Sequence, residues 1–371
     1  MRAVEPPRQE LFRRLNMAPY GTRELVHMRS DVIRLSKHAP HLRLVDADLA
    51  HLLGSWFNRG FLRLERIEWS SPALILEKLI TYESVHEIKG WHDLRRRLAP
   101  DRRCFAFFHP ALPDEPLIFV EVALVPGIAT SVAPLLDHGS SIVNPRHADT
   151  AIFYSINNTQ HGLRGISFGN FLVKQVLTEL QQELPWLTTF ATLSPIPGLA
   201  TALQEIAAGR LGDGLDRELL DRILANFSDV LHGITGIDNP TQAFFASLEG
   251  KHVEQREALA PVLRSVVLAY LSMARRHDGT VHDAVAAFHL ANGAAIERIN
   301  PFADQSEVGY RHAYGCMVNY LYDPETVVVN HERFVNTGQI TLSKTLAREY
   351  AKIKSLRVIK GNVANAHGGS S

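Results

Sequence analysis

The sequence has little of several features that define large classes of protein. It contains two cysteines, Cys104 and Cys316, which are too few for a disulfide framework. Its 39 basic and 39 acidic side chains cancel, so no net charge attracts it to nucleic acid or to an anionic membrane. No apolar run reaches the roughly 18 residues that a membrane span needs. We therefore expect neither a nucleic-acid partner nor a membrane partner.

The ends of the sequence lack recognisable targeting signals. The first residues have no apolar core and include Glu5 and Glu10, unlike a secretory signal. The last residues are Gly-Gly-Ser-Ser and differ from the Ser-Lys-Leu signal of peroxisomal proteins. We therefore expect a cytoplasmic protein.

Residues 150–198 contain the pattern around which we interpret the rest of the chain. A β-rich apolar run at Ala151–Ile156 leads into a polar turn at Asn157–Gly169. Apolar residues at helical spacing follow from Phe171 to Leu184, and a second β-rich run covers Leu187–Leu193. This order predicts a strand, a turn, a helix and a strand, with the two strands parallel through a right-handed crossover.

The turn before the predicted helix has the composition of an anion site. Arg164 begins a segment that includes Gly165 and Gly169, and these glycines let backbone N–H groups approach a phosphate oxygen closely. The partial positive charge of the helix start and the Arg164 guanidinium favour a pyrophosphate there. The alternative is an ordinary strand-to-helix turn whose glycines only relieve strain.

The remaining patterns indicate an α+β protein. Residues 1–57 have helical patterns, and a helix is predicted over Pro72–Val85. A run of further helical patterns over about 198–277 indicates a helical insertion packed on the sheet. Strands are predicted at Phe61–Trp69, Cys104–Phe108 and Leu117–Val125.

Ser194 lies where the second strand of the crossover ends. Pro195 and Pro197 follow it and favour extended or turn backbone, so its hydroxyl is expected where strand pairing stops. A capping serine is the alternative interpretation. The surrounding residues do not form the G-x-S-x-G turn of α/β-hydrolases, so that class is excluded.

His289 is the second candidate for chemistry. It lies at the end of a helical run, Val281–Leu290, and Asn292-Gly293 form a plausible helix stop. A structural role in the core is the alternative interpretation. His282 lies seven residues earlier and shares its helix face, but no carboxylate or cysteine at a recognised spacing completes a metal site. We therefore expect no metal.

Several of these segments resemble known families. The segment Arg164–Gly169 resembles the coenzyme A loop of GNAT acyltransferases, with Ser167 where that loop has its middle glycine. The wider motifs FYSINNTQHGLRGISFGNFLVKQV, TLSPIPG, FHLANGAAIERIN and YGCMVNYLY resemble the malonyl-CoA decarboxylase family, and the resemblance extends from about Gly21. It implies a GNAT-like mixed sheet with flanking helices, and conversion of malonyl-CoA to acetyl-CoA and CO2. It also implies no metal or organic cofactor and a homo-oligomer.

The resemblance also implies roles for particular residues. Ser194 and His289 match the catalytic serine and histidine motifs of the family. Ser155, Tyr320 and Tyr322 are second-rank candidates for lining the same pocket, and the loop residues expected to bind coenzyme A are Arg164, Gly165, Ile166, Ser167, Phe168, Gly169 and Asn170. Backbone N–H groups near Ile156–Asn158 are candidate donors to an enolate oxygen. Ser167 differs from the acidic residue found at that position in some members, so no carboxylate role carries over.

The sequence also bears on domain organisation, on a basic run and on alternative functions. Residues 1–57 resemble the end of a longer helical N-terminal domain, and residues 58–371 a catalytic domain. A basic run, Arg95, Arg96, Arg97, Arg102 and Arg103, is interpreted as a solvated face, with a contact to the 3′-phosphate of coenzyme A as the alternative. Two other functions stay open: a GNAT acyltransferase, which needs an acceptor amine, and a non-catalytic acyl-CoA sensor.

Overall fold

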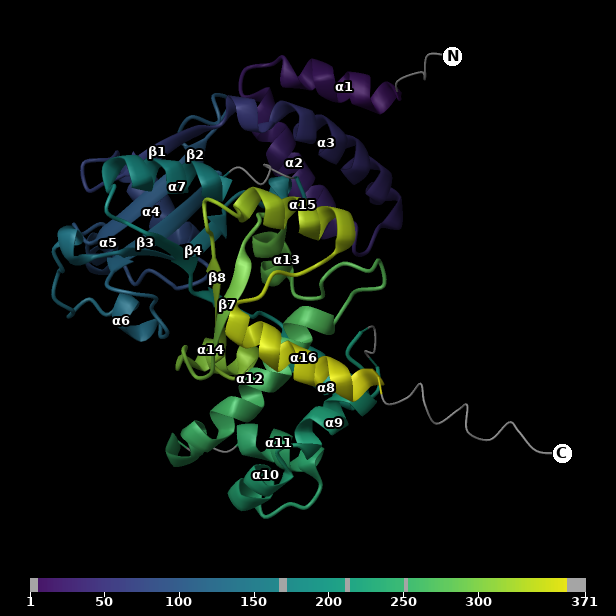
Figure 1. The fold of residues 1–371 in the computed structure, drawn as a ribbon. Coiled ribbons are helices and arrows are strands. Elements are labelled where there is room, and N and C mark those ends of the chain that lie inside the picture. Colours follow the sequence, from purple (N-terminus) through teal and green to yellow (C-terminus); the bar gives the residue numbers. More distant parts are fainter. Residues whose placement is uncertain (1–5, 167–171, 211–213, 250–252, 359–371) are drawn as a thin grey trace. The chain divides into compact units, whose positions relative to one another are not determined.

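The computed structural model describes residues 6–166, 172–210, 214–249 and 253–358. The chain forms two compact units (Figure 1). The first unit consists of Met1–Pro126 and His138–Thr188, and the second of Gly127–Asp137 and Thr189–Ser371. Both units contain helices and strands in segregated runs, which confirms the α+β class. None of the described helices has both the length and the apolar composition that crossing a membrane requires.

Three helices open the first unit and pack against one another (Figure 1). They are α1 (Pro7–Asn16), α2 (Gly21–Leu35) and α3 (Arg43–Trp56), with the short turn η1 (Pro40–Leu42) before α3. Leu25 and Val32 of α2 are buried, seven residues apart, as are Leu49 and Leu53 of α3, four residues apart. These spacings give each helix one apolar face, which explains the bundle.

An antiparallel sheet forms the centre of the first unit. Its strands follow chain order: β1 (Arg63–Ile67), β2 (Arg102–Phe108), β3 (Ile118–Val125) and β4 (Thr150–Asn158). Cys104, Ala106 and Phe108 point to one face, where they pack against α4 (Ala73–Tyr82) and α5 (Trp91–Arg97). On the other face, Arg103 pairs with Glu183 at the end of α7 (Leu172–Glu183). The strand predicted at Ala151–Ile156 and the helix predicted up to Leu184 are confirmed by β4 and α7, whereas the end of the predicted turn lies outside the described residues.

The five arginines predicted to form a solvated face do not form one. Arg95 alone among them is exposed, and its guanidinium lies 4.6 Å from the Trp69 ring centre. The other four are buried in ion pairs: Arg96 and Arg102 with Asp101, Arg97 with Asp93 and Glu121, and Arg103 with Glu183. The prediction was wrong because carboxylates, some near in the sequence such as Asp101 and some distant such as Glu183, pair with these charges inside the fold. The coenzyme A alternative stays a prediction.

The second unit contains a smaller antiparallel sheet built around β8 (Met317–Leu321). β7 (Ala295–Asn300), β5 (Thr189–Thr192) and β6 (Ser194–Pro195) each pair with β8. β5 is the second strand of the predicted crossover. It belongs to the second unit and β4 to the first, so their relative direction stays a prediction.

Helices supply the rest of the second unit. The region predicted as a helical insertion contains α8 (Leu199–Ala207), α9 (Arg217–Ala225), α10 (Ser228–Thr235), α11 (Pro240–Glu249) and α12 (Arg256–Met273). The others are α6 (Ala133–Leu136), α13 (Ala284–Ala291), α14 (Glu307–Ala313), α15 (Val327–Thr337) and α16 (Lys344–Val358). α12 contacts α9, α16 and β7, and eleven of its residues, from Leu259 to Met273, are buried. It is therefore the main apolar helix of this unit.

Candidate active site

Ser194 lies on the central sheet of the second unit. It begins the two-residue strand β6 and pairs with Val318 of β8, and strand pairing ends at the next residue, Pro195. Its side chain is buried, since the residue is 6% exposed. Pairing on a sheet fixes the backbone, and the serine hydroxyl therefore has a defined direction.

His289 comes from the last turn of α13. The Asp283 side chain accepts a hydrogen bond from the Ala286 N–H and starts this helix. Asn292 ends it, which confirms the predicted helix stop. His289 is 2% exposed. The helix thus places an imidazole inside the unit, although 94 residues separate Ser194 from His289 in the sequence.

A continuous chain of hydrogen bonds joins the two predicted residues. Ser194 Oγ lies 3.0 Å from His289 Nε2, and His289 Nδ1 lies 2.8 Å from the Tyr322 hydroxyl. Ser194 also donates to Thr192 Oγ1 at 2.9 Å. When the serine proton is directed to Thr192, Nε2–H of the histidine donates to Ser194 Oγ and Nδ1 accepts from Tyr322 O–H.

The Tyr320 ring stacks on one face of the His289 imidazole. The two rings are stacked with centroids 4.4 Å apart and an interplanar angle of 24°. The Tyr320 backbone N–H donates to Thr192 Oγ1 at 3.1 Å, which fixes the threonine that accepts from Ser194. The Asn319 side chain donates to the Thr192 carbonyl at 2.7 Å. β8 therefore contacts both the Thr192 end of the hydrogen-bond chain and the imidazole.

Burial keeps the site uncharged. It lowers the pKa of the His289 imidazole to about 3, so the ring is neutral at physiological pH. Burial also raises the pKa of the Tyr322 phenol. No described carboxylate forms a hydrogen bond or ion pair with His289, so nothing offsets the loss of solvation.

The predicted histidine pair does not form a metal site. Both ring nitrogens of His289 already face hydrogen-bond partners, and His282 Nδ1 lies 3.0 Å from the Tyr270 hydroxyl. Within the described ranges, no three or more histidine, cysteine, aspartate or glutamate side chains are grouped so as to hold a metal ion.

The predicted coenzyme A loop is described only in its first part. Arg164, Gly165 and Ile166 lie in the first unit, whereas Ser167, Phe168, Gly169 and Asn170 fall outside the described residues. Gly165 has a φ of +78°, a conformation that favours glycine. Arg29 of α2 donates to the Arg164 carbonyl at 3.0 Å and to the Gly162 carbonyl at 2.7 Å. A helix from the N-terminal segment therefore supports the start of this loop.

Ser155 has a partner that the sequence did not indicate. Its hydroxyl donates to Glu83 Oε2 at 2.8 Å, and Asn157 donates to the same oxygen at 2.8 Å. Ser155 belongs to the first unit, so its role at the site stays a prediction. The same holds for the N–H groups near Ile156–Asn158.

Sequence reasoning missed Thr192. It occurs two residues before Ser194 on the same extended segment, and residues so spaced point to the same face of a sheet. This alternation was the available signal. The structure thus brings together four predicted residues, Ser194, His289, Tyr320 and Tyr322, and adds Thr192.

The fold and the site together define an α+β protein with a buried serine–histidine pair. Comparison with known proteins identifies the family. Residues 60–360 match the malonyl-CoA decarboxylase C-terminal domain, and residues 1–57 match the N-terminal domain of the same family. The chain belongs to the malonyl-CoA decarboxylase family.

Individual relatives agree with this assignment. The mitochondrial malonyl-CoA decarboxylase of Anser anser anser is 35% identical over 358 residues, which cover 92% of this chain and 69% of the relative. The Rattus norvegicus protein is 33% identical over 363 residues, with coverages of 95% and 73%.

Solved structures give the same result. The malonyl-CoA decarboxylase of Rhodopseudomonas palustris is 47% identical, has a TM-score of 0.83 and covers 94% of this chain and 80% of its own. The Agrobacterium vitis protein is 46% identical, with a TM-score of 0.78 and coverages of 93% and 80%.

Proposed function

We propose that this chain converts malonyl-CoA to acetyl-CoA and CO2. The observation that carries the proposal is the buried contact between Ser194 Oγ and His289 Nε2 at 3.0 Å, in a chain of the malonyl-CoA decarboxylase family. Both residues come from the motifs that carried the sequence resemblance.

The reaction needs donors and a proton, and no cofactor. The malonyl carboxylate is β to a thioester carbonyl, so loss of CO2 leaves its electron pair as an enolate delocalised onto the thioester oxygen. Fixed hydrogen-bond donors stabilise such an oxyanion, and one donor contributes about 2.7–4 kcal/mol. We assign Ser194 O–H to this task, with the hydroxyl turning from Thr192 to the substrate.

The neutral resting state of His289 determines how the proton arrives. A bound malonyl carboxylate brings negative charge beside the imidazole, which raises the pKa of His289. The imidazole then takes up one proton from water as substrate binds. After CO2 leaves, His289 delivers that proton to the α-carbon of the enolate, directly or through Ser194, and the neutral imidazole is restored.

An incubation with malonyl-CoA and no acyl acceptor tests the proposal. We expect stoichiometric acetyl-CoA and CO2 by chromatography and headspace analysis. An acyltransferase would yield neither without an amine, and a sensor would return bound malonyl-CoA unchanged. Either of the last two results would overturn the proposal.

Matched variants test the assignment of residues. We expect Ser194→Ala and His289→Asn each to lower kcat by at least about a hundredfold, because they remove a donor and the proton carrier. His312→Asn is the control, since this exposed histidine lies on α14 outside the site. Normal turnover by folded His289→Asn protein would refute the role of His289.

Location, assembly and domain roles remain part of the proposal. The animal relatives are described as mitochondrial, and we keep the cytoplasmic assignment for this chain as a prediction. Homo-oligomerisation, the loop residues as the coenzyme A contact, and the functional division between residues 1–57 and 58–371 are predictions of the same kind.

A further inference from the structure

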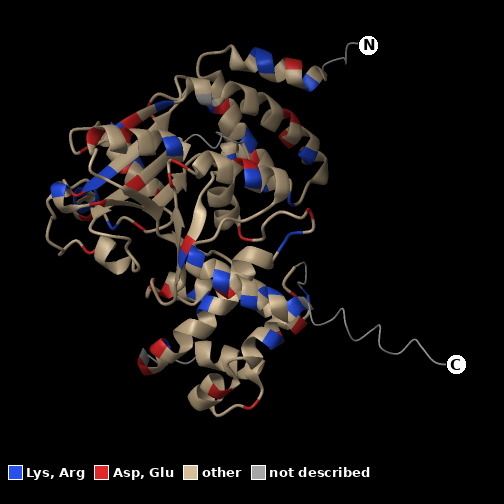
Figure 2. Ribbon diagram, in the orientation of Figure 1, with Lys and Arg blue, Asp and Glu red and all other residues tan. Residues whose placement is uncertain are grey.

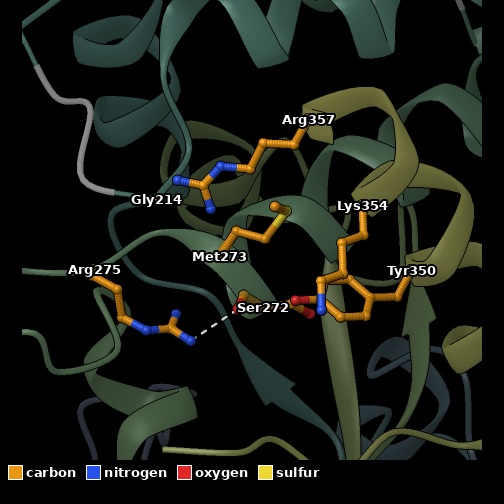
Figure 3. A pocket seen from close by; sticks show the side chains of 7 residues that line it. All are labelled: Gly214, Ser272, Met273, Arg275, Tyr350, Lys354 and Arg357. Atoms are coloured by element: carbon orange, nitrogen blue, oxygen red, sulfur yellow. Dashed lines mark hydrogen bonds between the residues drawn. The ribbon is translucent and has the colours of Figure 1, made fainter. Parts of the chain in front are cut away.

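A basic pocket lies in the second unit, apart from the residues assigned to decarboxylation. Its volume is about 300 Å³. The side chains in Figure 3 line it: Gly214, Ser272, Met273, Arg275, Tyr350, Lys354 and Arg357. Three of these described lining residues are cationic and none is acidic. The pocket therefore has the charge of an anion site.

One face of α16 supplies most of the polar groups. Tyr350, Lys354 and Arg357 are spaced by four and three residues, which places them on one side of the helix. Figure 2 shows the basic bands along α16, and the helix contains five basic residues against one acidic residue, Glu349. Glu349 pairs with Arg264 at 3.2 Å. The single carboxylate of the helix is thus already engaged by another arginine.

Arg275 supplies a third cation in a fixed position. Its guanidinium donates to the carbonyl oxygens of Ser272 at 2.9 Å and Ala274 at 3.0 Å, at the C-terminal end of α12. Both acceptors are uncharged, so these bonds orient the guanidinium without neutralising it. A half-buried, oriented arginine of this kind is suited to binding an oxyanion.

Ser272 provides an independent indication of a ligand. The residue is 4% exposed, and its Oγ has no hydrogen-bond partner among the described residues. A buried hydroxyl without a partner is destabilising, so it needs an explanation. In Figure 3, the Tyr350 and Lys354 side chains extend from α16 towards Ser272. An acceptor oxygen of a ligand in this pocket would satisfy the serine.

Gly214 lets the backbone close over the end of α12. Its φ is +88°, and a Cβ at this position would lie 1.8 Å from the Met273 carbonyl oxygen. A larger residue would therefore push the chain away from the pocket. The close contact between Gly214 and Met273 therefore forms one wall of the pocket.

We propose that this pocket binds a phosphate group. Arg275, Lys354 and Arg357 neutralise its charge, and the Ser272 and Tyr350 hydroxyls donate to its oxygens. Three cations and two hydroxyl donors match a dianion with several acceptor oxygens better than a single carboxylate. The phosphate is either that of a free metabolite or one carried by a coenzyme A ester.

Calorimetric titration of inorganic phosphate into the full-length chain tests the proposal, with chloride at equal ionic strength as the blank. We expect saturable binding that is about tenfold weaker in each of Lys354→Gln, Arg357→Gln and Ser272→Ala. Arg275→Gln is avoided as the main test because Arg275 also caps α12. Lys352→Gln is the matched control, since this exposed cation lies on α16 but does not line the pocket.

Two results would overturn the proposal: no heat beyond the chloride blank, or equal affinity in the Lys354→Gln/Arg357→Gln double variant and the control. Competition then identifies the source of the phosphate. Displacement by coenzyme A but not by dephospho-coenzyme A assigns the 3′-phosphate, and displacement by both assigns the pyrophosphate. Displacement by neither assigns a free phosphate compound. Because the readout is phosphate binding, it does not depend on whether the chain decarboxylates malonyl-CoA.

Discussion

The interiors of the two units handle buried polar groups in opposite ways. In the first unit, Arg97 and Glu121 are both buried and pair at 2.9 Å, and Asp93 pairs with the same arginine at 3.1 Å. In the second unit, Ser194, His289 and Tyr322 form a buried chain without a charged member. The first arrangement retains charges by pairing them, whereas the second buries its histidine in the neutral form.

Of the substitutions proposed here, removal of the Arg97 side chain should have the largest effect, which is a loss of stability. At pH 8, Arg97→Met leaves the Glu121 carboxylate buried and unpaired, so we expect a loss of about 3–5 kcal/mol in the free energy of unfolding by urea titration. The double variant Arg97→Met/Glu121→Leu should recover much of it. Arg95→Met is the control, because Arg95 is exposed. Equal stability of wild type and Arg97→Met would show that the ion pair contributes nothing.

The neutral histidine predicts an unusual pH dependence of activity. The parameter kcat/KM reports groups of the free protein, and His289 has a pKa of about 3 there. The protonated fraction therefore falls as pH rises, and kcat/KM should decrease by about tenfold per pH unit between pH 5 and 8. The value of kcat should vary less, because substrate raises the pKa of His289. A plateau of kcat/KM across this range would contradict His289 as the proton source.

Tyr322→Phe tests the outer end of the hydrogen-bond chain. It leaves His289 Nδ1 buried without its hydrogen-bond partner, so we expect kcat to fall by about 10- to 100-fold with little change in KM. Tyr310→Phe is the control, since this hydroxyl donates to the Leu248 carbonyl outside the site. A change confined to KM would indicate that Tyr322 contributes to binding and does not position the imidazole.

Glu121 in the first unit and His289 in the second should make the free energy of unfolding change with pH in opposite directions. Burial raises the pKa of Glu121 from 4.5 to about 7, so its contribution to stability is lost as pH rises through that window. Burial lowers the pKa of His289 from 6.5 to about 3, so stability is lost as pH falls through that window. Each slope approaches about 1.4 kcal/mol per pH unit at most.

Urea titrations at several pH values measure these slopes. Glu121→Gln should remove the loss at rising pH, and His289→Gln the loss at falling pH. If both variants changed the slope in the same direction, the contrast between the two interiors would be wrong.

Of the proposed substitutions, Arg29→Gln should have the smallest effect, which is a rise in KM. It weakens the support of the Gly162 and Arg164 carbonyls, so we expect KM for malonyl-CoA to rise by about two- to tenfold with kcat unchanged. Arg34→Gln, on the exposed part of α2, is the control. An unchanged KM would show that the contact between α2 and the loop does not contribute to substrate binding.

Sequence patterns predicted the local structure well where periodicity was strong. The strands around Phe105, Val120 and Ile152, and the helix containing Val176, all follow from apolar spacing. The burial of the arginines was not predictable, because it depends on packing and on distant partners, such as Glu121 for Arg97 and Glu183 for Arg103, that only the tertiary fold brings near. The Ser194–His289 pair came from motif resemblance, whereas the neutral state of His289 depends on burial that no motif encodes.

Gly162 gives the first 57 residues a further significance. A methyl group there would lie 1.9 Å from the Val26 carbonyl oxygen, so α2 sits directly on the main chain at this point. A shortened protein that began after α2 would lose the Arg29 donor and uncover the Gly162 backbone to solvent. α2 therefore supports the segment that leads to Arg164, and we expect that segment to lose its structure if α2 is removed.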